Sequence, residues 1–189
     1  MKFELIEKCL ACNSSNLLDI LDLGSQPLAN AYRNADDENS EETFPLLFRV
    51  CQQCLHGQIS VAINPKILYE DYSYVSGTTS TLDAYFKEFS KEIAERGRTL
   101  SVLDIAANDG SFVKSLINEG LTACGVDPAR NLVEKALEDG LPIHLGFWTS
   151  EFARELNQKF DVITAMNVLA HVGDPADFLI GCSEALNEN

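Results

Sequence analysis

The stretch Val102-Leu-Asp-Ile-Ala-Ala-Asn-Asp-Gly-Ser-Phe112 indicates a strand that passes through a tight turn into a helix. Apolar residues fill the strand, an acid stands near its end, and small residues with one glycine form the turn, where backbone can approach a ligand closely. The stretch differs from the dinucleotide fingerprint G-x-G-x-x-G, because Ala106 and Asn108 occupy the first two glycine positions. The turn therefore favours a ligand that has no pyrophosphate.

Strand and helix patterns alternate on both sides of this turn. The expected strands are residues 100–105, 123–126, 142–145 and 160–166. The expected helices are residues 82–97, 110–118, 129–138, 149–157 and 174–186. Such alternation is typical of right-handed βαβ units in a parallel sheet with helices on both faces. We therefore expect an α/β fold whose Rossmann-like sheet is incomplete, because only these strands are present.

A second acid ends the next expected strand, in Cys124-Gly-Val-Asp127-Pro. An acid about 20 residues beyond the first turn can hydrogen-bond the hydroxyl groups of a ribose. Asp104 and Asp109 would repel a pyrophosphate but would tolerate an ammonium or sulfonium group. Asp104, Gly110 and Asp127 together predict a nucleoside site for S-adenosylmethionine, although each acid taken alone could simply be solvated.

The ends of the third and fourth strands add further candidates to this site. Phe147 and Trp148 could flank an adenine ring or pack in the core, and His171 could steer a substrate, move a proton or pack at the sheet edge. The residues expected to bind the methyl donor are Asp104, Ala106, Asn108, Gly110, Asp127, Pro128, Phe147 and Asn167.

Cysteines form two C-x-x-C pairs in the first third of the chain, and the predicted metal ligands are Cys9, Cys12, Cys51 and Cys54. A pair at this spacing lies on one tight turn, so two pairs can complete a tetrahedral four-thiolate site. We expect structural Zn²⁺, and a rubredoxin-like iron site or a redox pair remains an alternative. A closed site leaves no open coordination position, so this metal would hold the fold together without taking part in a reaction.

The expected domains are a small β-rich zinc-bound module, residues 1–75, and the Rossmann-like domain, residues 76–189. Zinc would replace the hydrophobic core that such a small polar module cannot build. Cys124 and Cys182 are expected to be small buried hydrophobic side chains. His56 is expected to lie beside the metal or at the surface without binding it.

Charge and hydropathy exclude several classes of partner. The chain has 14 Lys and Arg against 29 Asp and Glu, and its net charge of −15 would repel nucleic acid and anionic lipid. Its apolar runs are shorter than the ~20 residues that span a bilayer, and acidic residues stand where a signal peptide would be apolar. We expect a cytoplasmic protein with no nucleic-acid or membrane partner.

Several segments read together resemble the sugar C-methyltransferase family, which acts on nucleoside-diphosphate-linked ketosugars. The cysteine pairs, Asp22-Leu-Gly-Ser-Gln-Pro-Leu-Ala-Asn30, Phe44-Pro-Leu46 and Gln58 are similar to its N-terminal zinc-binding domain. Tyr72-Ser-Tyr-Val-Ser-Gly77 looks like its linking motif, and Leu103 to Phe112 with Asn167-Val-Leu-Ala-His-Val172 look like its class I methyltransferase domain. Ala106 departs from the pattern, since a glycine is usual at this position.

The resemblance implies a reaction. A proton leaves the carbon next to a ketone, and the resulting enolate attacks the sulfonium methyl group of S-adenosylmethionine. By analogy Tyr72 and Tyr74 would lie near the substrate or the donor, and His171 would lie at the crevice. A nucleotide-linked ketosugar is therefore the expected small-molecule partner.

A second departure concerns the C-terminal part of the family, where a Tyr-His-Glu-His-type segment follows a fifth strand. The sequence ends at Asn189, before any such strand. We therefore expect low or no activity from these residues alone, with a C-terminal companion segment or a second copy as partner. The alternative is a non-catalytic zinc-containing module that binds the donor or another protein. A nicotinamide oxidoreductase is disfavoured, because the dinucleotide fingerprint is missing.

Overall fold

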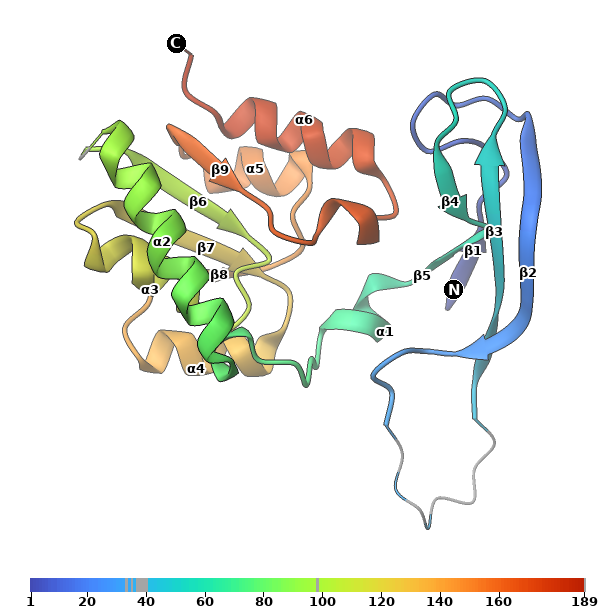
Figure 1. Ribbon diagram of the computed structural model, residues 1–189, viewed down its shortest axis with the longest axis horizontal. Coiled ribbons are helices and arrows are strands. Elements are labelled where there is room, and N and C mark those ends of the chain that lie inside the picture. The colour runs from blue at the N-terminus through green and yellow to red at the C-terminus, as the bar shows by residue number, and fades with distance from the viewer. Residues whose placement is uncertain (33, 35, 37–40, 98, 189) are drawn as a thin grey trace. The chain divides into compact units, whose positions relative to one another are not determined.

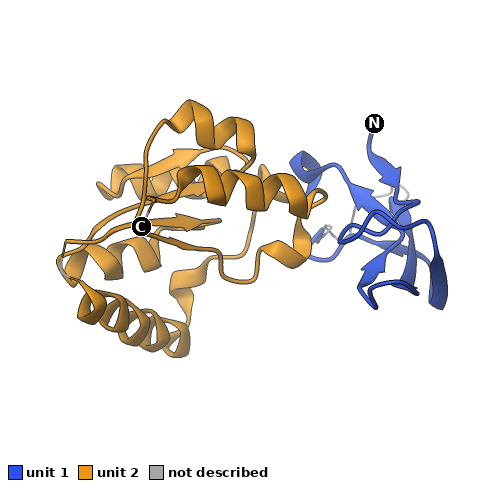
Figure 2. Cartoon of the chain, turned by 90° about the horizontal axis from the view of Figure 1, so that it is seen from above, with its two compact units in different colours: residues 1–68 blue, residues 69–189 orange. Residues whose placement is uncertain are grey.

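The computed structural model describes residues 1–32, 34, 36, 41–97 and 99–188. They form two compact units, Met1–Leu68 and Tyr69–Asn189 (Figure 2). The division lies before the boundary expected at residue 75, because the backbone from Glu70 to Gly77 hydrogen-bonds to groups of the second unit. In the described part of the chain, every helix is too short or too polar to cross a membrane.

The first unit consists of short antiparallel strands (Figure 1). The pairs are β1 (Phe3–Leu5) with β5 (Val61–Ile63), and β2 (Leu17–Pro27) with β3 (Thr43–Cys51), which also pairs with β4 (Gly57–Ile59). The buried hydrophobic side chains described in this unit are Cys9, Phe44, Cys51 and Val61. So small a core, half of it cysteine, indicates that another interaction stabilises the unit. The short helix α1 (Pro65–Tyr69) follows β5.

The second unit contains a four-stranded parallel sheet in the order β8-β7-β6-β9. Its strands are β6 (Ser101–Ile105), β7 (Thr122–Asp127), β8 (Ile143–Leu145) and β9 (Val162–Thr164). Its helices are α2 (Ser80–Arg96), α3 (Ser111–Asn118), α4 (Arg130–Glu138), α5 (Ser150–Leu156) and α6 (Pro175–Ala185), with 3₁₀ turns η1 (Ser76–Thr78) and η2 (Leu169–His171). The predicted α/β class is confirmed.

Helices cover both faces of this sheet (Figure 1). Successive side chains of a strand point to opposite faces, so Val102 packs with α2, α3 and α4, whereas Leu103 and Ile105 pack with α5 and α6. Phe112 is 1% exposed in the first of these clusters and stacks on Phe89. The two clusters hold β6 and β7 rigidly, and both strands end at the same edge of the sheet.

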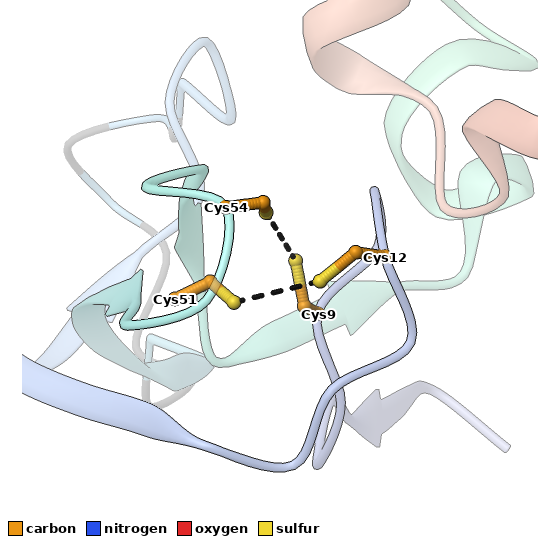
Figure 3. Close-up of side chains that lie close together, drawn as sticks. All are labelled: Cys9, Cys12, Cys51 and Cys54. Carbon is orange, nitrogen blue, oxygen red and sulfur yellow. Dashed lines mark hydrogen bonds between the residues drawn. The ribbon is translucent and has the colours of Figure 1, made fainter.

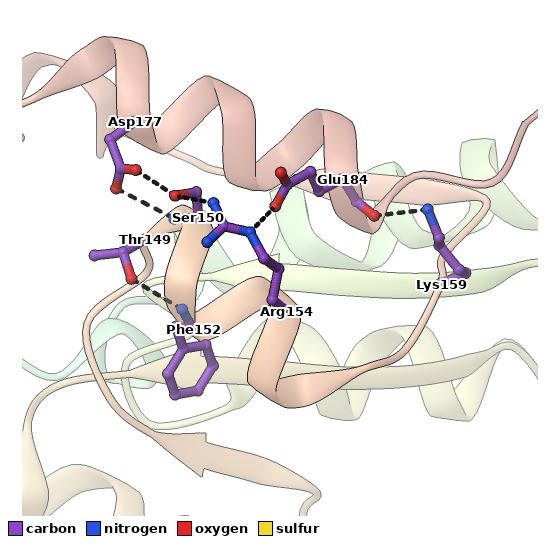
Figure 4. A network of polar contacts seen from close by, with 7 residues as sticks. All are labelled: Thr149, Ser150, Phe152, Arg154, Lys159, Asp177 and Glu184. Carbon is purple, nitrogen blue, oxygen red and sulfur yellow. Dashed lines mark hydrogen bonds and ion pairs between the residues drawn. The ribbon is translucent and has the colours of Figure 1, made fainter.

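Polar contacts fix α5 against α6 (Figure 4). The Asp177 carboxylate accepts hydrogen bonds from the backbone N–H and hydroxyl of Ser150. Arg154 donates to Glu184 over 2.9 Å and to the Ser150 hydroxyl over 2.8 Å. Thr149 caps α5 by accepting from Phe152 N. These bonds position the loop after β8, which carries two of the candidate aromatic residues.

The strand before the last helix is shorter than expected. Residues 160–166 were predicted to form a strand, whereas β9 covers Val162–Thr164. Phe160 instead forms a single parallel bridge with Leu186, and Asn167 has a φ of 55°, which ends extended structure. Among the described residues, β9 pairs with β6 on one side and has no strand partner on its other side.

Candidate metal and donor sites

The structure brings the four predicted metal ligands together (Figure 3). The sulfur of Cys9 lies 3.6 Å from that of Cys54, and the sulfur of Cys12 lies 3.6 Å from that of Cys51. All four sulfur atoms lie within 4.8 Å of one another. A tetrahedron with Zn–S bonds of about 2.3 Å has sulfur–sulfur edges of about 3.8 Å, so four thiolates in this arrangement fit a zinc ion.

Tight turns hold each pair in this geometry. The Asn13 N–H donates to the Cys9 carbonyl oxygen, and the Leu55 N–H donates to the Cys51 carbonyl oxygen. Asn13 and Leu55 both have positive φ values, 60° and 64°, so each chain turns back sharply after its second cysteine. Backbone N–H groups of Cys54 and Gln53 lower the pKa of the Cys51 thiol to about 6, whereas burial and contacts with neighbouring sulfur atoms raise the pKa of the Cys12 and Cys54 thiols.

Gln58 supports the first turn from the side, a role that the sequence alone did not reveal. Its side chain is 6% exposed. The Gln58 carbonyl Oε1 accepts from Leu10 N over 2.9 Å, and Nε2 donates to the Lys8 carbonyl oxygen over 3.0 Å. Both backbone groups flank Cys9, so this one side chain fixes the direction in which the first ligand points.

Replacing this glutamine should weaken metal binding. In Gln58→Ala the backbone groups beside Cys9 lose their partners, and we expect zinc affinity to fall about tenfold, a loss typical for groups that orient metal ligands. Competition with a chromophoric chelator measures the affinity. Gln52→Ala is the matched control, because Gln52 is exposed on the second turn. Equal affinity of Gln58→Ala and the wild type would contradict the orienting role.

The predicted donor turn closes onto the end of β7. Asp127 accepts from Asn108 N through Oδ2 and from Ala129 N through Oδ1, each over 2.8 Å. Burial raises the pKa of Asp127, while these two N–H groups lower it. Each carboxylate oxygen keeps a lone pair for another donor, such as a ribose hydroxyl. The structure thus brings the two predicted halves of the site together.

Close backbone approach explains the small residues of this turn. Ala106, Asn108 and Gly110 have φ values of 58°, 55° and 75°, a region that disfavours side chains. The sugar C-methyltransferase family usually has a glycine at position 106, and a glycine would adopt this φ freely. Ala106 is strained there by roughly 1 kcal/mol. A Cβ at Gly125 on the neighbouring strand would overlap the Ala107 methyl group. The turn can therefore lie directly on β7.

Asp104 lies beneath the turn and is 3% exposed. Burial raises the pKa of its carboxyl to about 7, against a lowering by the Thr164 hydroxyl, and nearby Asp127 raises it further. Thr164 Oγ1 lies 2.7 Å from Asp104 Oδ1 and 3.3 Å from the Leu103 carbonyl oxygen. The Thr164 hydroxyl donates to Asp104 Oδ1 and, over the longer distance, to the Leu103 carbonyl oxygen. The acid thus links β6 to β9.

The stability of the second unit should depend on this proton. Because the pKa of Asp104 rises from 3.8 to about 7 on folding, the folded state holds the proton more tightly. Stability from this group is present at acidic pH and is lost as pH rises from about 4 to 7, at up to about 1.4 kcal/mol per pH unit.

Asp104→Asn should remove most of the change of the free energy of unfolding with pH, since a neutral amide does not titrate. Urea unfolding followed by the fluorescence of Trp148, the only tryptophan in the chain, measures the second unit, in which this side chain is 8% exposed. The comparison is made at several pH values between 4 and 7. Parallel pH profiles for the variant and the wild type would contradict the assignment.

The remaining candidates at the methyl-donor site differ in how far their side chains are exposed. Trp148 is buried and donates from Nε1 to the Phe178 carbonyl oxygen, so the core alternative is confirmed for it. Phe147 and Pro128 are partly exposed at the ends of β8 and β7, and Asn167 is exposed after β9. Cys124 and Cys182, expected to be buried, are half-buried.

The predicted catalytic residues come from two segments. His171 is exposed at the end of η2. Tyr72 and Tyr74 lie side by side, with ring centroids 6.5 Å apart, on the segment that precedes α2. That segment is bound by the side chains of Asn108 and Asn131. Asn131 was missed from the sequence, because no local spacing connects it to residues so far away in the chain.

Two family models match consecutive parts of the chain. Residues 76–189 match the family model described as “Methyltransferase domain”, and residues 9–69 match the one described as “Putative zinc binding domain”. Solved structures that resemble parts of the chain include coclaurine N-methyltransferase, with 16% identity, a TM-score of 0.49 and coverage of 64% of this chain and 37% of that one. The sugar N-methyltransferase KedS8 from Streptoalloteichus has 20% identity, a TM-score of 0.45 and coverage of 60% and 50%.

Two curated relatives align by sequence. The C-methyltransferase NovU of Streptomyces niveus is 29% identical over 188 residues, which cover 96% of this chain and 45% of NovU. The ubiquinone biosynthesis O-methyltransferase of Roseobacter denitrificans is 30% identical over 105 residues, which cover 52% and 42%. The chain spans less than half the length of either relative. Through residues 76–189 the chain belongs to the methyltransferase domain family, and the residues that match the zinc-binding domain model precede that part.

Proposed function

We propose that the second unit binds S-adenosylmethionine and that the chain takes part in methyl transfer to a carbon of a nucleotide-linked ketosugar. The observation that carries the proposal is the junction of the donor turn with Asp127, where a buried carboxylate that accepts two backbone N–H groups keeps a lone pair on each oxygen. The likeness to a C-methyltransferase over nearly the whole chain supports a carbon acceptor.

Each group in the junction has a distinct task in this proposal. Asp127 accepts hydrogen bonds from the ribose hydroxyls, and the Ala106-to-Gly110 turn lets the donor approach the backbone closely. Phe147 and Pro128, which are partly exposed, would contact the adenine, and the exposed Asn167 after β9 would bind another part of the donor. Asp104 holds the turn from below through Thr164. S-adenosylmethionine, when bound, supplies an electrophilic methyl group on a sulfonium.

The acceptor side is assigned to Tyr72, Tyr74 and His171. The tyrosines would orient the sugar and exclude water from the reacting carbon, and His171 would steer the substrate or accept a proton. Because Tyr74 is 48% exposed and His171 is exposed, water still reaches these side chains. We therefore expect slow transfer from these 189 residues by themselves.

The four cysteines, in the same proposal, hold a structural Zn²⁺. Four thiolates close the coordination shell, so no position is open for substrate or water. The metal would stabilise the first unit and stay outside the reaction. A cytoplasmic location fits reduced thiols, since disulfides are rare in that compartment.

Incubation with methyl-labelled donor and a 4-keto nucleotide sugar tests the function. We expect slow incorporation of label, in a carbon–carbon bond next to the ketone, and none with the same sugar after reduction of its ketone. Label recovered on an oxygen or nitrogen would contradict the carbon acceptor. Rapid turnover would contradict the expectation of low activity.

A non-catalytic binding module is the second candidate. Apolar side chains are exposed along β2, which is an edge strand of its sheet among the described residues: Leu18, Ile20, Leu21 and Leu23. The partly open edge at β9 offers backbone groups to a companion segment or a second copy. Donor binding without transfer to any ketosugar, together with concentration-dependent self-association, would favour this candidate.

A further inference from the structure

Asparagine side chains bind the backbone of the segment Tyr72–Gly77, here called the strap, which joins α1 to α2 (Figure 1). Asn131 Oδ1 accepts from Tyr72 N over 3.2 Å, and its Nδ2 donates to the Tyr72 carbonyl oxygen over 2.9 Å. Asn108 Oδ1 accepts from Ser76 N over 2.9 Å, and its Nδ2 donates to the Tyr74 carbonyl oxygen over 3.0 Å. Each carboxamide therefore uses both of its polar ends on the strap.

This pattern imitates the edge of a β-sheet. In an extended chain the backbone groups that face one side recur at every second residue, and the bonded residues are Tyr72, Tyr74 and Ser76. The rings of Tyr72 and Tyr74, whose backbone carbonyl oxygens these bonds hold, lie 6.5 Å apart. The two asparagines therefore set the position of both tyrosines.

The other ends of these contacts lead to Asp127. Asn108 donates its backbone N–H to Asp127 Oδ2, and its side chain is 8% exposed. Asn131 lies in the first turn of α4, two residues after Ala129, whose N–H donates to Asp127 Oδ1. The side chains of Asn108 and Asn131, here called the clamps, are therefore both anchored next to the Asp127 carboxylate, which we propose binds the ribose hydroxyls.

We infer that Asn108 and Asn131 are positioning residues that fix the strap to the donor turn, so that occupancy of the donor site orders Tyr72 and Tyr74. The inference rests on the proposed function. A donor that engages Asp127 restricts the motion of the turn and of the start of α4. Because the clamps join these two elements to the strap, the tyrosines become ordered when the methyl group is in place.

Amide hydrogen exchange of the full chain tests the positioning directly, by NMR at the Tyr72, Ser76 and Gly77 amides. Asn108→Gly removes one side chain at a φ of 55° that glycine adopts easily, and Asn131→Ala removes the other. We expect exchange at Ser76 to accelerate about tenfold in the first variant, and exchange at Tyr72 to do so in the second. Asn118→Ala, at the exposed end of α3, is the control and should change neither rate.

The second part of the inference, that occupancy of the donor site orders the strap, is tested with S-adenosylhomocysteine. Its binding is first measured by calorimetry. In the wild type and the control, saturation should slow exchange at both Tyr72 and Ser76, and each clamp variant should lose this slowing at its own amide. Equal exchange rates at Tyr72 and Ser76 with and without the ligand would mean that the strap is fixed independently of the donor, which would contradict the coupling. Asn131→Asp, which keeps the acceptor for Tyr72 N but loses the donor, should restore part of the protection.

Two outcomes separate the inference from the proposed function. If S-adenosylhomocysteine binds but exchange at the strap does not respond, the coupling is wrong and the donor site stands. If S-adenosylhomocysteine does not bind the wild type, both the donor site and the coupling are wrong. The exchange rates of the variants without ligand still test whether the two asparagines position the strap. Unchanged rates at Ser76 in Asn108→Gly and at Tyr72 in Asn131→Ala would overturn the positioning itself.

Discussion

Removal of zinc is expected to unfold residues 1–68 while residues 69–188 remain folded. The first unit buries few apolar side chains, and two of those described are predicted metal ligands. Structural zinc supplies about 10–16 kcal/mol of binding free energy in zinc-finger peptides, more than such a core can replace. The second unit has its own two hydrophobic clusters, so we expect it to stay folded without the metal.

A strong chelator and the variant Cys51→Ser both test this expectation. Amide resonances of β2 and β3 should collapse to unfolded positions, while the fluorescence of Trp148 in the second unit should stay unchanged. Cys182→Ser is the control, because this thiol lies on α6 outside the quartet. Dispersed β2 and β3 resonances in protein shown by elemental analysis to be metal-free would contradict the structural role.

The second large effect is expected at Asp127. Asp127→Ala should weaken binding of S-adenosylmethionine about 100-fold. The change removes acceptors for the ribose and also for Asn108 N and Ala129 N, and a hydrogen bond to a charged group contributes about 1.5–3 kcal/mol. Asp127→Asn should lose about tenfold, since its amide oxygen can still accept one of these N–H groups.

Calorimetric titration measures these affinities. Asp139→Ala removes an exposed acid at the end of α4 and is the matched control for charge. Trp148 fluorescence should show that each variant remains folded under the titration conditions. An affinity of Asp127→Ala within threefold of the wild type would remove the ribose role from this residue.

The features that depend on residues close together in the sequence were predictable from it. The C-x-x-C spacing placed each thiol pair on one turn, and the acids at the ends of β6 and β7 were found because parallel strands end at one edge. Strand–helix alternation likewise indicated the four-stranded parallel sheet. In each case the signal lies within a few residues, so one sequence is enough.

Contacts between residues far apart in the sequence were not predictable. Gln58 binds backbone nearly 50 residues earlier, Thr164 meets Asp104 across 60 residues, and Asn131 reaches Tyr72 across 59. Asn108 is predicted to bind the donor, but the sequence did not indicate that its side chain binds the strap or that its backbone N–H donates to Asp127. The length of β9 was also overestimated, because an apolar run does not reveal where its pairing stops.

Titration of the purified chain with S-adenosylmethionine and, separately, with NADH tests the central claim most directly. The claim is that the junction between the donor turn and Asp127 binds a nucleoside with a cationic centre and no pyrophosphate. We expect saturable heat with one site per chain for S-adenosylmethionine and no binding heat for NADH. Saturable binding of NADH without binding of S-adenosylmethionine would contradict the account.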